Sequence, residues 1–138
     1  MASYLFDKCK ESLLSQNPSI DFDTDTIKVA ICNVATDNGS VTSATQYKSS
    51  VTSYGASTDQ TLGSKTVTGG TFDAGDSTFT SVAVDGAKTV GALVIYKDTG
   101  NPATSPLIAW IDGFTPITPN GGNISVTWDA GSNKIFAL

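Results

Sequence analysis

The chain has 138 residues, of which 39 % are hydrophobic and 15 % are charged, and its net charge at neutral pH is −5. The length predicts a single domain over residues 1–138 with a core of its own, and abundant Ser, Thr and Gly favour short strands and tight turns over long helices. The acidic charge and the scattered basic residues argue against nucleic acid as a partner, and the lack of a long apolar run argues against a membrane.

The first residues predict an amphipathic helix over residues 3–16. Ser3 is the expected N-cap and Asn17-Pro18 the expected stop, because proline disfavours the helical conformation of the residue before it. Charged residues interrupt the apolar stretch that a signal peptide requires, so we expect synthesis and folding in the cytosol. The helix should cover the domain's own sheet, with a partner's surface as the alternative. Its apolar residues recur at spacings of three and four, at Leu5, Phe6, Cys9, Leu13 and Leu14.

Three aspartates follow at alternate positions, Asp21, Asp23 and Asp25. This spacing matches the first ligands of a helix-loop-helix calcium site. However, Thr26 stands where that loop requires glycine for its sharp turn, and Cys32 stands where it requires a bidentate acid. Two defining residues of a calcium loop are therefore missing.

The same stretch is better interpreted as a hinge. In a straight strand, the three carboxylates would share a face with the buried residues that follow, which is unfavourable. A break near Asp25 is therefore required. We expect Ile20 and Phe22 to pack inward, Asp21 and Asp23 to stay solvated, and Asp25 to cap the turn into the next strand.

Residues 26–34 predict a central strand, because apolar residues occupy both alternating faces, with Lys28 as the exception. Residues 36–64 are polar and weakly patterned. They predict a long surface excursion with few anchors, at Val41, Tyr47, Val51 and Tyr54. Two thiols in a cytosolic chain are usually buried and reduced, so a disulfide between Cys9 and Cys32 is not expected.

The remaining sequence is patterned as strands. Residues 65–84 alternate in short stretches separated by turn residues, which predicts two or three short strands. Four clearer strands follow, over residues 89–98, 105–112, 123–129 and 133–138, and their connections imply short antiparallel hairpins. The predicted fold is mainly β: an antiparallel β-sandwich, of which a jelly roll is one form, with strands over residues 26–138 and one N-terminal amphipathic helix.

The sequence carries no recognisable catalytic grouping. It has no histidine, which removes the commonest general base and the commonest ligand of catalytic zinc. A pair of carboxylates could still act as in glycosidases. However, six aspartates stand beside turn residues, where such side chains normally bond the backbone: Asp73, Asp76, Asp85, Asp98, Asp112 and Asp129. Calcium held by loops around Asp73 and Asp76 is the remaining metal alternative. We predict no enzyme activity and no cofactor.

Three aromatic residues could form a sugar-stacking platform, namely Tyr96, Trp110 and Trp128. Trp128 continues the face of Ile124 and Val126, and Trp110 lies within an apolar strand, so a core or interface position is favoured over sugar stacking. The last residues, "KIFAL", are apolar where a free end is usually polar. This end should be tied to a sheet of its own domain or, less expectedly, to a neighbouring subunit.

Four blocks of the sequence resemble a family of small structural proteins of tailed bacteriophages. The blocks are "TDTIKVAICN", "KTVTGGTFDAGDSTFTSV", "ALVIYKDTGNPATSPLIAWID" and "PITPNGGNISVTWDAGSNKIFAL". The resemblance covers most of the chain and is weakest between residues 36 and 64. It implies a non-enzymatic virion component assembled in the host cytoplasm, and within that class a capsid decoration or cement protein on the outside of the head lattice.

The resemblance also implies protein partners. These are the major capsid protein or other virion proteins, together with further copies of this chain in a homo-oligomer. The alternative is a tail or fibre component that binds a host-surface glycan through Trp110, Tyr96 or residues 36–64. Candidate interface residues are Leu5, Phe6, Leu13, Tyr47, Tyr54, Phe136 and Leu138.

Overall fold

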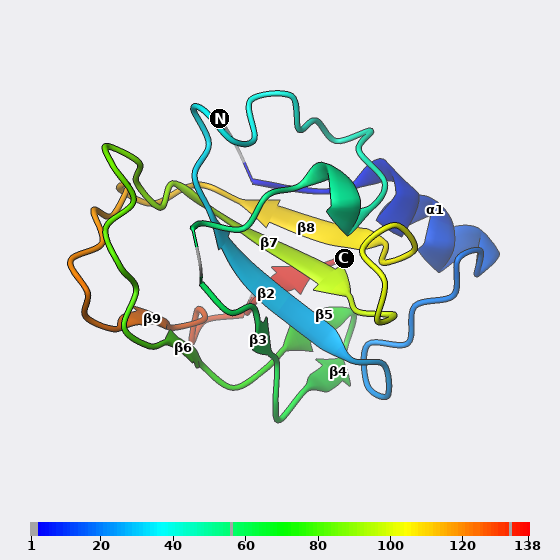
Figure 1. The fold of residues 1–138 in the computed structure, drawn as a ribbon. Helices are drawn as coiled ribbons and strands as arrows, with labels where there is room; N and C mark the ends of the chain where they lie inside the picture. The colour runs from blue at the N-terminus through cyan, green and yellow to red at the C-terminus, as the bar shows by residue number, and fades with distance from the viewer. Residues whose placement is uncertain (1–2, 56, 133) are drawn as a thin grey trace.

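The computed structural model of the chain describes residues 3–55, 57–132 and 134–138. Its elements are, in chain order, β1 (Tyr4–Leu5), α1 (Asp7–Ser15), β2 (Ile27–Cys32), the 3-10 helix η1 (Lys48–Ser50), β3 (Gln60–Thr61), β4 (Thr66–Thr68), β5 (Thr71–Asp73), β6 (Ser77–Phe79), β7 (Ala92–Lys97), β8 (Leu107–Ile111), β9 (Ile124–Val126) and β10 (Phe136–Ala137). The fold is mainly β, with antiparallel sheets and a helix near the N-terminus (Figure 1), which confirms the predicted fold class. No helix in these ranges is long and apolar enough to cross a bilayer.

A five-stranded antiparallel sheet, in the order β1-β8-β7-β2-β3, forms the centre of the molecule (Figure 1). β2 is an interior strand, and every residue from Ile27 to Cys32 is paired with β7, so the predicted central strand is confirmed. The register of β7 against β8 shifts between Ile95 and Tyr96. This bulge lets the adjacent residues Ile108 and Ala109 pack into the same core cluster, whereas neighbours in a regular strand point to opposite faces.

Both faces of the central sheet are buried. One face packs against two small sheets, β10-β5-β4 and β6-β9, and the shared core makes the molecule a sandwich. The other face carries a second cluster that includes Tyr96 and Trp110, and the buried side chains of Val41 and Val51 pack into it. Residues 41–51 of the predicted surface excursion thus cover the second face of the sheet, whereas Tyr54 and Leu62, later in the same segment, pack into the first cluster. A strand that is apolar on both faces requires such a cover.

The N-terminal helix is shorter than predicted. The expected range of 3–16 is wrong at its start, because Tyr4 and Leu5 form β1 and pair with β8. α1 begins only at Asp7, and the preceding Phe6 makes no side-chain capping bond. Ser3 is therefore not the N-cap. An amphipathic spacing of three and four does not reveal that an edge strand of two residues precedes the first helical turn.

The helix nevertheless covers its own domain, as expected. Cys9 and Ser12 are buried, Leu13 is half-buried against the core, and α1 packs on β8. Leu14 belongs to the predicted apolar stripe but is 90 % exposed. Cys9 lies in the core between the sheets, whereas Cys32 lies in the cluster on the opposite face, so the two free thiols are separated by the sheet.

The predicted succession of hairpins is wrong for the last two strands. β9 does not pair with a sequence neighbour but with β6, where Ile124 lies opposite Phe79. β10 pairs with β5, where Phe136 lies opposite Phe72. The backbone N–H of Leu138 also donates to the carbonyl of Gly70 at 2.8 Å. The apolar C-terminal segment is thus held in a sheet of its own domain, as expected.

Candidate functional site

A buried lysine organises the polar contacts over the second face of the sheet. The Nζ of Lys48 donates to the carbonyl of Val51 at 2.9 Å and to the hydroxyl of Ser53 at 3.1 Å. The same Nζ lies 4.0 Å from the carboxylate of Asp59. Asp59 also accepts hydrogen bonds from Ser53 at 2.8 Å and from the Tyr96 hydroxyl at 2.6 Å. These residues, Lys48, Ser53, Asp59 and Tyr96, form what we call the lysine cluster.

The electrostatics of the lysine cluster favour a structural role. Burial raises the pKa of the Tyr96 phenol, and its hydrogen bond to the Asp59 carboxylate raises that pKa further. The phenol therefore stays protonated and acts as a hydrogen-bond donor rather than as a base. Burial also raises the pKa of the nearby Cys32 thiol to about 12, which keeps the thiol neutral and unreactive. The lysine cluster thus connects Lys48, Ser53 and Asp59, which lie between β2 and β3, to Tyr96 in β7.

Two of the strand-end aspartates, Asp98 and Asp129, hold turns as predicted, whereas Asp76 bonds a backbone N–H that is distant in the sequence. The Asp76 carboxylate accepts the N–H of Trp128 at 3.1 Å, and Asp129 accepts the N–H of Gly131 at 3.0 Å. Asp98 accepts the N–H of Gly100 at 2.9 Å. A hydrogen bond from Lys28 and this backbone bond hold the pKa of the Asp98 carboxyl below its ordinary value. The carboxylates of Asp98 and Asp129 are thus engaged in local turns, and that of Asp76 connects the residue before β6 to the segment after β9.

The other three strand-end aspartates have side-chain partners. Asp112 accepts the indole N–H of Trp110 at 3.1 Å. Asp73 lies 3.8 Å from Lys134, and Asp85 lies 3.4 Å from Lys88. Among the residues described, no three His, Cys, Asp or Glu side chains gather closely enough to hold a metal ion. Asp73 and Asp76, named above as a calcium alternative, have different partners: Asp73 pairs with Lys134, and Asp76 accepts the N–H of Trp128.

The three alternate aspartates form the expected hinge. The Asp25 carboxylate accepts the N–H of Asp21 at 2.8 Å and pairs with Lys97 at 2.8 Å. The Asp21 carboxylate accepts the N–H groups of Asp23 and Thr24 at 3.0 and 3.2 Å. These backbone bonds hold the pKa of the Asp21 carboxyl below its ordinary value. Asp21 and Asp23 are exposed, and Asp25 is half-buried at the start of β2.

Two apolar residues of the same hinge pack inward, as predicted. Phe22 is 8 % exposed, and its ring centroid lies 5.0 Å from that of Phe72 and 5.6 Å from that of Phe136. Ile20 is half-buried against the same core. The hinge therefore ties the segment after α1 to β5 and β10 of the second layer.

The positive charge of the molecule is balanced locally. All eight basic residues are lysines, and each has an acidic or carbonyl partner. The ion pairs are Lys8–Glu11, Lys10–Asp7, Lys28–Asp98, Lys48–Asp59, Lys88–Asp37, Lys97–Asp25 and Lys134–Asp73, and Lys65 donates to the carbonyl of Asp25. Exposed pairs of this kind add little stability. Their main consequence is that the excess negative charge resides on the remaining carboxylates.

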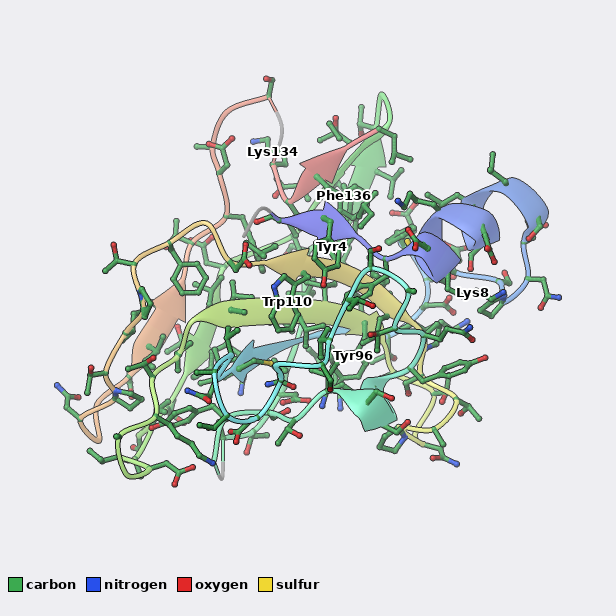
Figure 2. The ribbon with its side chains drawn as sticks, turned by 90° about the horizontal axis from the view of Figure 1, so that it is seen from above. Tyr4, Lys8, Tyr96, Trp110, Lys134 and Phe136 are labelled. Atoms are coloured by element: carbon green, nitrogen blue, oxygen red, sulfur yellow. The ribbon has the colours of Figure 1, made fainter. Side chains whose placement is uncertain are left out.

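The large aromatic residues lie in the core, which confirms the preference over a sugar-stacking platform. Trp110 is fully buried, Tyr96 is 5 % exposed and Trp128 is 9 % exposed. Tyr96 and Trp110 lie on the side of the central sheet that is crossed by residues 36–64 (Figure 2). The indole N–H of Trp128 donates to the carbonyl of Gly75 at 3.1 Å. None of the three presents a ring face to solvent.

The seven candidate interface residues divide by exposure. Phe6 and Tyr54 are buried, so they stabilise the core and cannot present a surface to a partner. Leu138 is 72 % exposed. The four others are half-buried and keep some accessible surface, namely Leu5, Leu13, Tyr47 and Phe136.

One surface feature has no signal in the sequence. A cleft of about 350 Å³ lies between residues 54, 55, 57, 58 and 60, the last of which begins β3, and residues 79–85, the first of which ends β6. Ser and Thr side chains line much of it, together with Gln60, Val84 and Asp85. Sequence reasoning named residues 36–64 as one segment that could bind a glycan, but it missed the cleft itself, because the two walls are not adjacent along the chain and neither carries a motif.

Comparisons with known proteins found no protein-family model, no curated protein and no solved structure that matches this chain.

Proposed function

We propose that this protein is a non-enzymatic structural component of a tailed-bacteriophage virion, and within that class a decoration protein bound to the outside of the head lattice. The four sequence blocks that resemble phage structural proteins are the source of the proposed class. The structure supports a structural rather than a catalytic role, because the lysines and strand-end aspartates are engaged in ion pairs, turns and buried contacts.

The observation that carries the binding role is the exposure of two leucines, one in the N-terminal segment and one at the C-terminal end, the two segments that hold most of the candidate interface residues. Leu14 of α1 is 90 % exposed, and Leu138, which follows β10, is 72 % exposed. A single exposed leucine is ordinary on a protein surface. On a symmetric lattice, however, each small contact is repeated, so apolar side chains at two contact elements add up to stable attachment. The partners are the major capsid protein and neighbouring copies of this chain.

The copy number per particle tests this proposal most directly. Quantitative mass spectrometry of purified virions should give a copy number comparable with that of the major capsid protein. Selective removal of the protein should lower the temperature at which heads release their DNA. A copy number typical of a tail tip would instead support the alternative, a tail or fibre component that binds a host-surface glycan.

A matched pair of variants tests the contact element α1. Leu14→Glu places a charge on the exposed leucine position and should reduce the occupancy of purified heads by added protein. Ser15→Glu adds the same charge to the neighbouring exposed residue and should leave occupancy nearly unchanged. Equal binding by both variants would show that α1 is not a contact element.

A further inference from the structure

We propose that the cleft lined by residues 54, 55, 57, 58 and 60 and by residues 79–85 binds a neutral saccharide. This inference goes beyond attachment to a particle and does not depend on where the protein is located. The cleft volume of about 350 Å³ lies within the range of small-molecule sites and fits a mono- or disaccharide. We call it the hydroxyl cleft. Its lining residues lie in the segment that leads into β3 and at the end of β6 and in the segment after it.

The first wall of the hydroxyl cleft is held in place by the central sheet. The N–H of Tyr54 donates to the carbonyl of Ile31 in β2 at 2.7 Å. The hydroxyl of Ser57 donates to the carbonyl of Tyr54 at 2.6 Å. Tyr54 itself is buried, so its ring forms part of the floor rather than a stacking surface. The wall is therefore formed before any ligand binds.

The second wall is held by the segment before β9. The N–H of Val82 donates to the carbonyl of Gly122 at 2.9 Å, and the N–H of Ser81 donates to the side chain of Asn123 at 3.0 Å. The two walls are joined directly, because the N–H of Asp85 donates to the Tyr54 hydroxyl at 3.0 Å. A cleft with both walls fixed requires little ordering when a ligand binds, which favours affinity.

The lining combines the groups that recognise sugars. Thr58, Thr80 and Ser81 are exposed, and each offers a hydroxyl that both donates and accepts hydrogen bonds. Gln60 adds an amide. Val84 is 61 % exposed and supplies an apolar surface for the C–H groups of a sugar ring. A polyhydroxyl ligand with apolar ring faces matches this mixture, whereas a purely apolar ligand would leave the polar groups without partners.

The charges around the cleft favour a neutral ligand. Asp85 is the one charged residue among the described lining residues. Its lysine neighbour, Lys88, lies 3.4 Å from Asp85 and 3.1 Å from Asp37, so one positive charge is shared between two negative ones. This local excess of negative charge disfavours phosphates and acidic sugars. A single carboxylate is also too little for a cation site.

An NMR titration of the isotope-labelled full chain tests the inference. The probes are glucose, galactose, mannose, rhamnose and N-acetylglucosamine, each added separately to millimolar concentrations. At least one should shift the amide signals of residues 54–60 and 79–85 in a saturable manner. Glucuronate should bind more weakly than glucose, because its carboxylate is repelled by Asp85 and Asp37. Absence of any saturable shift, shifts confined to another surface, or tighter binding of glucuronate would overturn the proposal.

Matched variants connect the binding to the cleft. Val84→Asp should weaken binding of the responsive sugar by about tenfold, and Thr80→Ala by several-fold. Their controls are Val67→Asp and Thr68→Ala, which make the same changes on the exposed strand β4 and should bind like the parent protein. Equal weakening by variant and control would also overturn the proposal. The virion copy number is measured independently, so failure of sugar binding would leave the proposed structural role untouched.

Discussion

Lys48 is a residue whose position costs free energy unless its partners are in place. Only 9 % of its surface is exposed, and an ammonium group removed from water must regain hydrogen bonds and an opposite charge. Val51 and Ser53 accept its N–H groups, Asp59 supplies the charge, and the Tyr96 ring lies 5.5 Å from its Nζ. The burial of this lysine cannot be inferred from the sequence, because the residue stands in a polar, weakly patterned segment.

Substitution of Asp59 should therefore reveal the cost of leaving Lys48 without a charge partner. We expect Asp59→Ala to lower the free energy of unfolding by about 2 kcal/mol, because it also removes the acceptor of the Tyr96 hydroxyl. Urea denaturation measures this change. Asp23→Ala, on the exposed part of the hinge, is the control and should change stability by less than about 0.5 kcal/mol. Similar losses in both variants would contradict a special role for the lysine cluster.

The carboxyl group of Asp98 should make the stability of the folded state depend on pH in the acidic range. Its carboxyl pKa lies below the ordinary value of 3.8, chiefly because of the hydrogen bond from Lys28 and then because of the Gly100 N–H. A group with a lowered folded-state pKa contributes stability that is fully present above its unfolded pKa. That contribution is lost as the pH falls through the folded-state pKa.

We accordingly expect the effect of Asp98→Asn to depend on pH. The variant should melt at a lower temperature than the parent at neutral pH, because the bond to Lys28 loses its charge. At a pH well below the carboxyl pKa, both proteins carry a neutral side chain, so the difference should largely disappear. Melting curves recorded across this pH range provide the measurement. A difference that stays constant down to strong acid would contradict the linkage to Asp98.

At the scale of elements, the pairing of β10 with β5 closes the second layer. Phe136 lies opposite Phe72, and its ring centroid is 5.6 Å from that of Phe72 and 5.6 Å from that of Phe22. Three elements far apart in the chain thus share one aromatic contact: the hinge, β5 and β10. The apolar ending of the sequence indicated that this segment is held down, but its partner strand is more than sixty residues earlier.

This contact predicts different effects for two neighbouring apolar residues. Phe136→Ala should lower the free energy of unfolding by about 2 kcal/mol, less than the roughly 3–5 kcal/mol typical of a buried aromatic truncation, because the side chain is only half-buried. Leu138→Ala should change it by less than about 0.5 kcal/mol, since Leu138 is 72 % exposed. Thermal and urea unfolding of both variants provide the comparison. A larger loss for Leu138→Ala would mean that the end of the chain is held differently.

At the scale of the whole molecule, the central sheet lies between two covers. The small sheets bury one face, and the segment that carries Val41 and Val51 buries the other. The hinge over residues 17–26 leads from α1 into the central sheet. Its carboxylates are held by backbone N–H groups and by Lys97. These contacts within the protein are sufficient to hold the acidic hinge, and no metal ion is required.

Thermal stability should consequently be independent of divalent cations. We expect the same melting temperature with excess chelator and with added calcium, because the oxygens of Asp21 and Asp25 already have protein partners. Scanning calorimetry of the full chain measures this. As a positive control, a calcium-binding protein treated in parallel should lose stability in the chelator. A large drop in the melting temperature of this protein would reopen the interpretation of the three aspartates as a metal site.

Patterns of side chains by themselves determined that residues 26–34 hold a central strand, that Trp110 is buried and how the hinge is built. Residues 26–34 are apolar on both alternating faces, and Trp110 lies within an apolar strand, so their burial follows from local chemistry. The same holds for Asp25, because a carboxylate cannot continue the buried face of β2. These features depend on residues close together in the chain.

Only the tertiary structure decided the strand partners, the start of the helix and the hydroxyl cleft. Tyr4 and Leu5 form a strand because they pair with β8, although the spacing of apolar residues at the start of the chain fits a helix. The two walls of the cleft are brought together by the hydrogen bond from the backbone N–H of Asp85 to the Tyr54 hydroxyl. Each of these features depends on a contact between distant segments. Hydrophobic periodicity records which face of an element is buried, but it does not record which other element buries it.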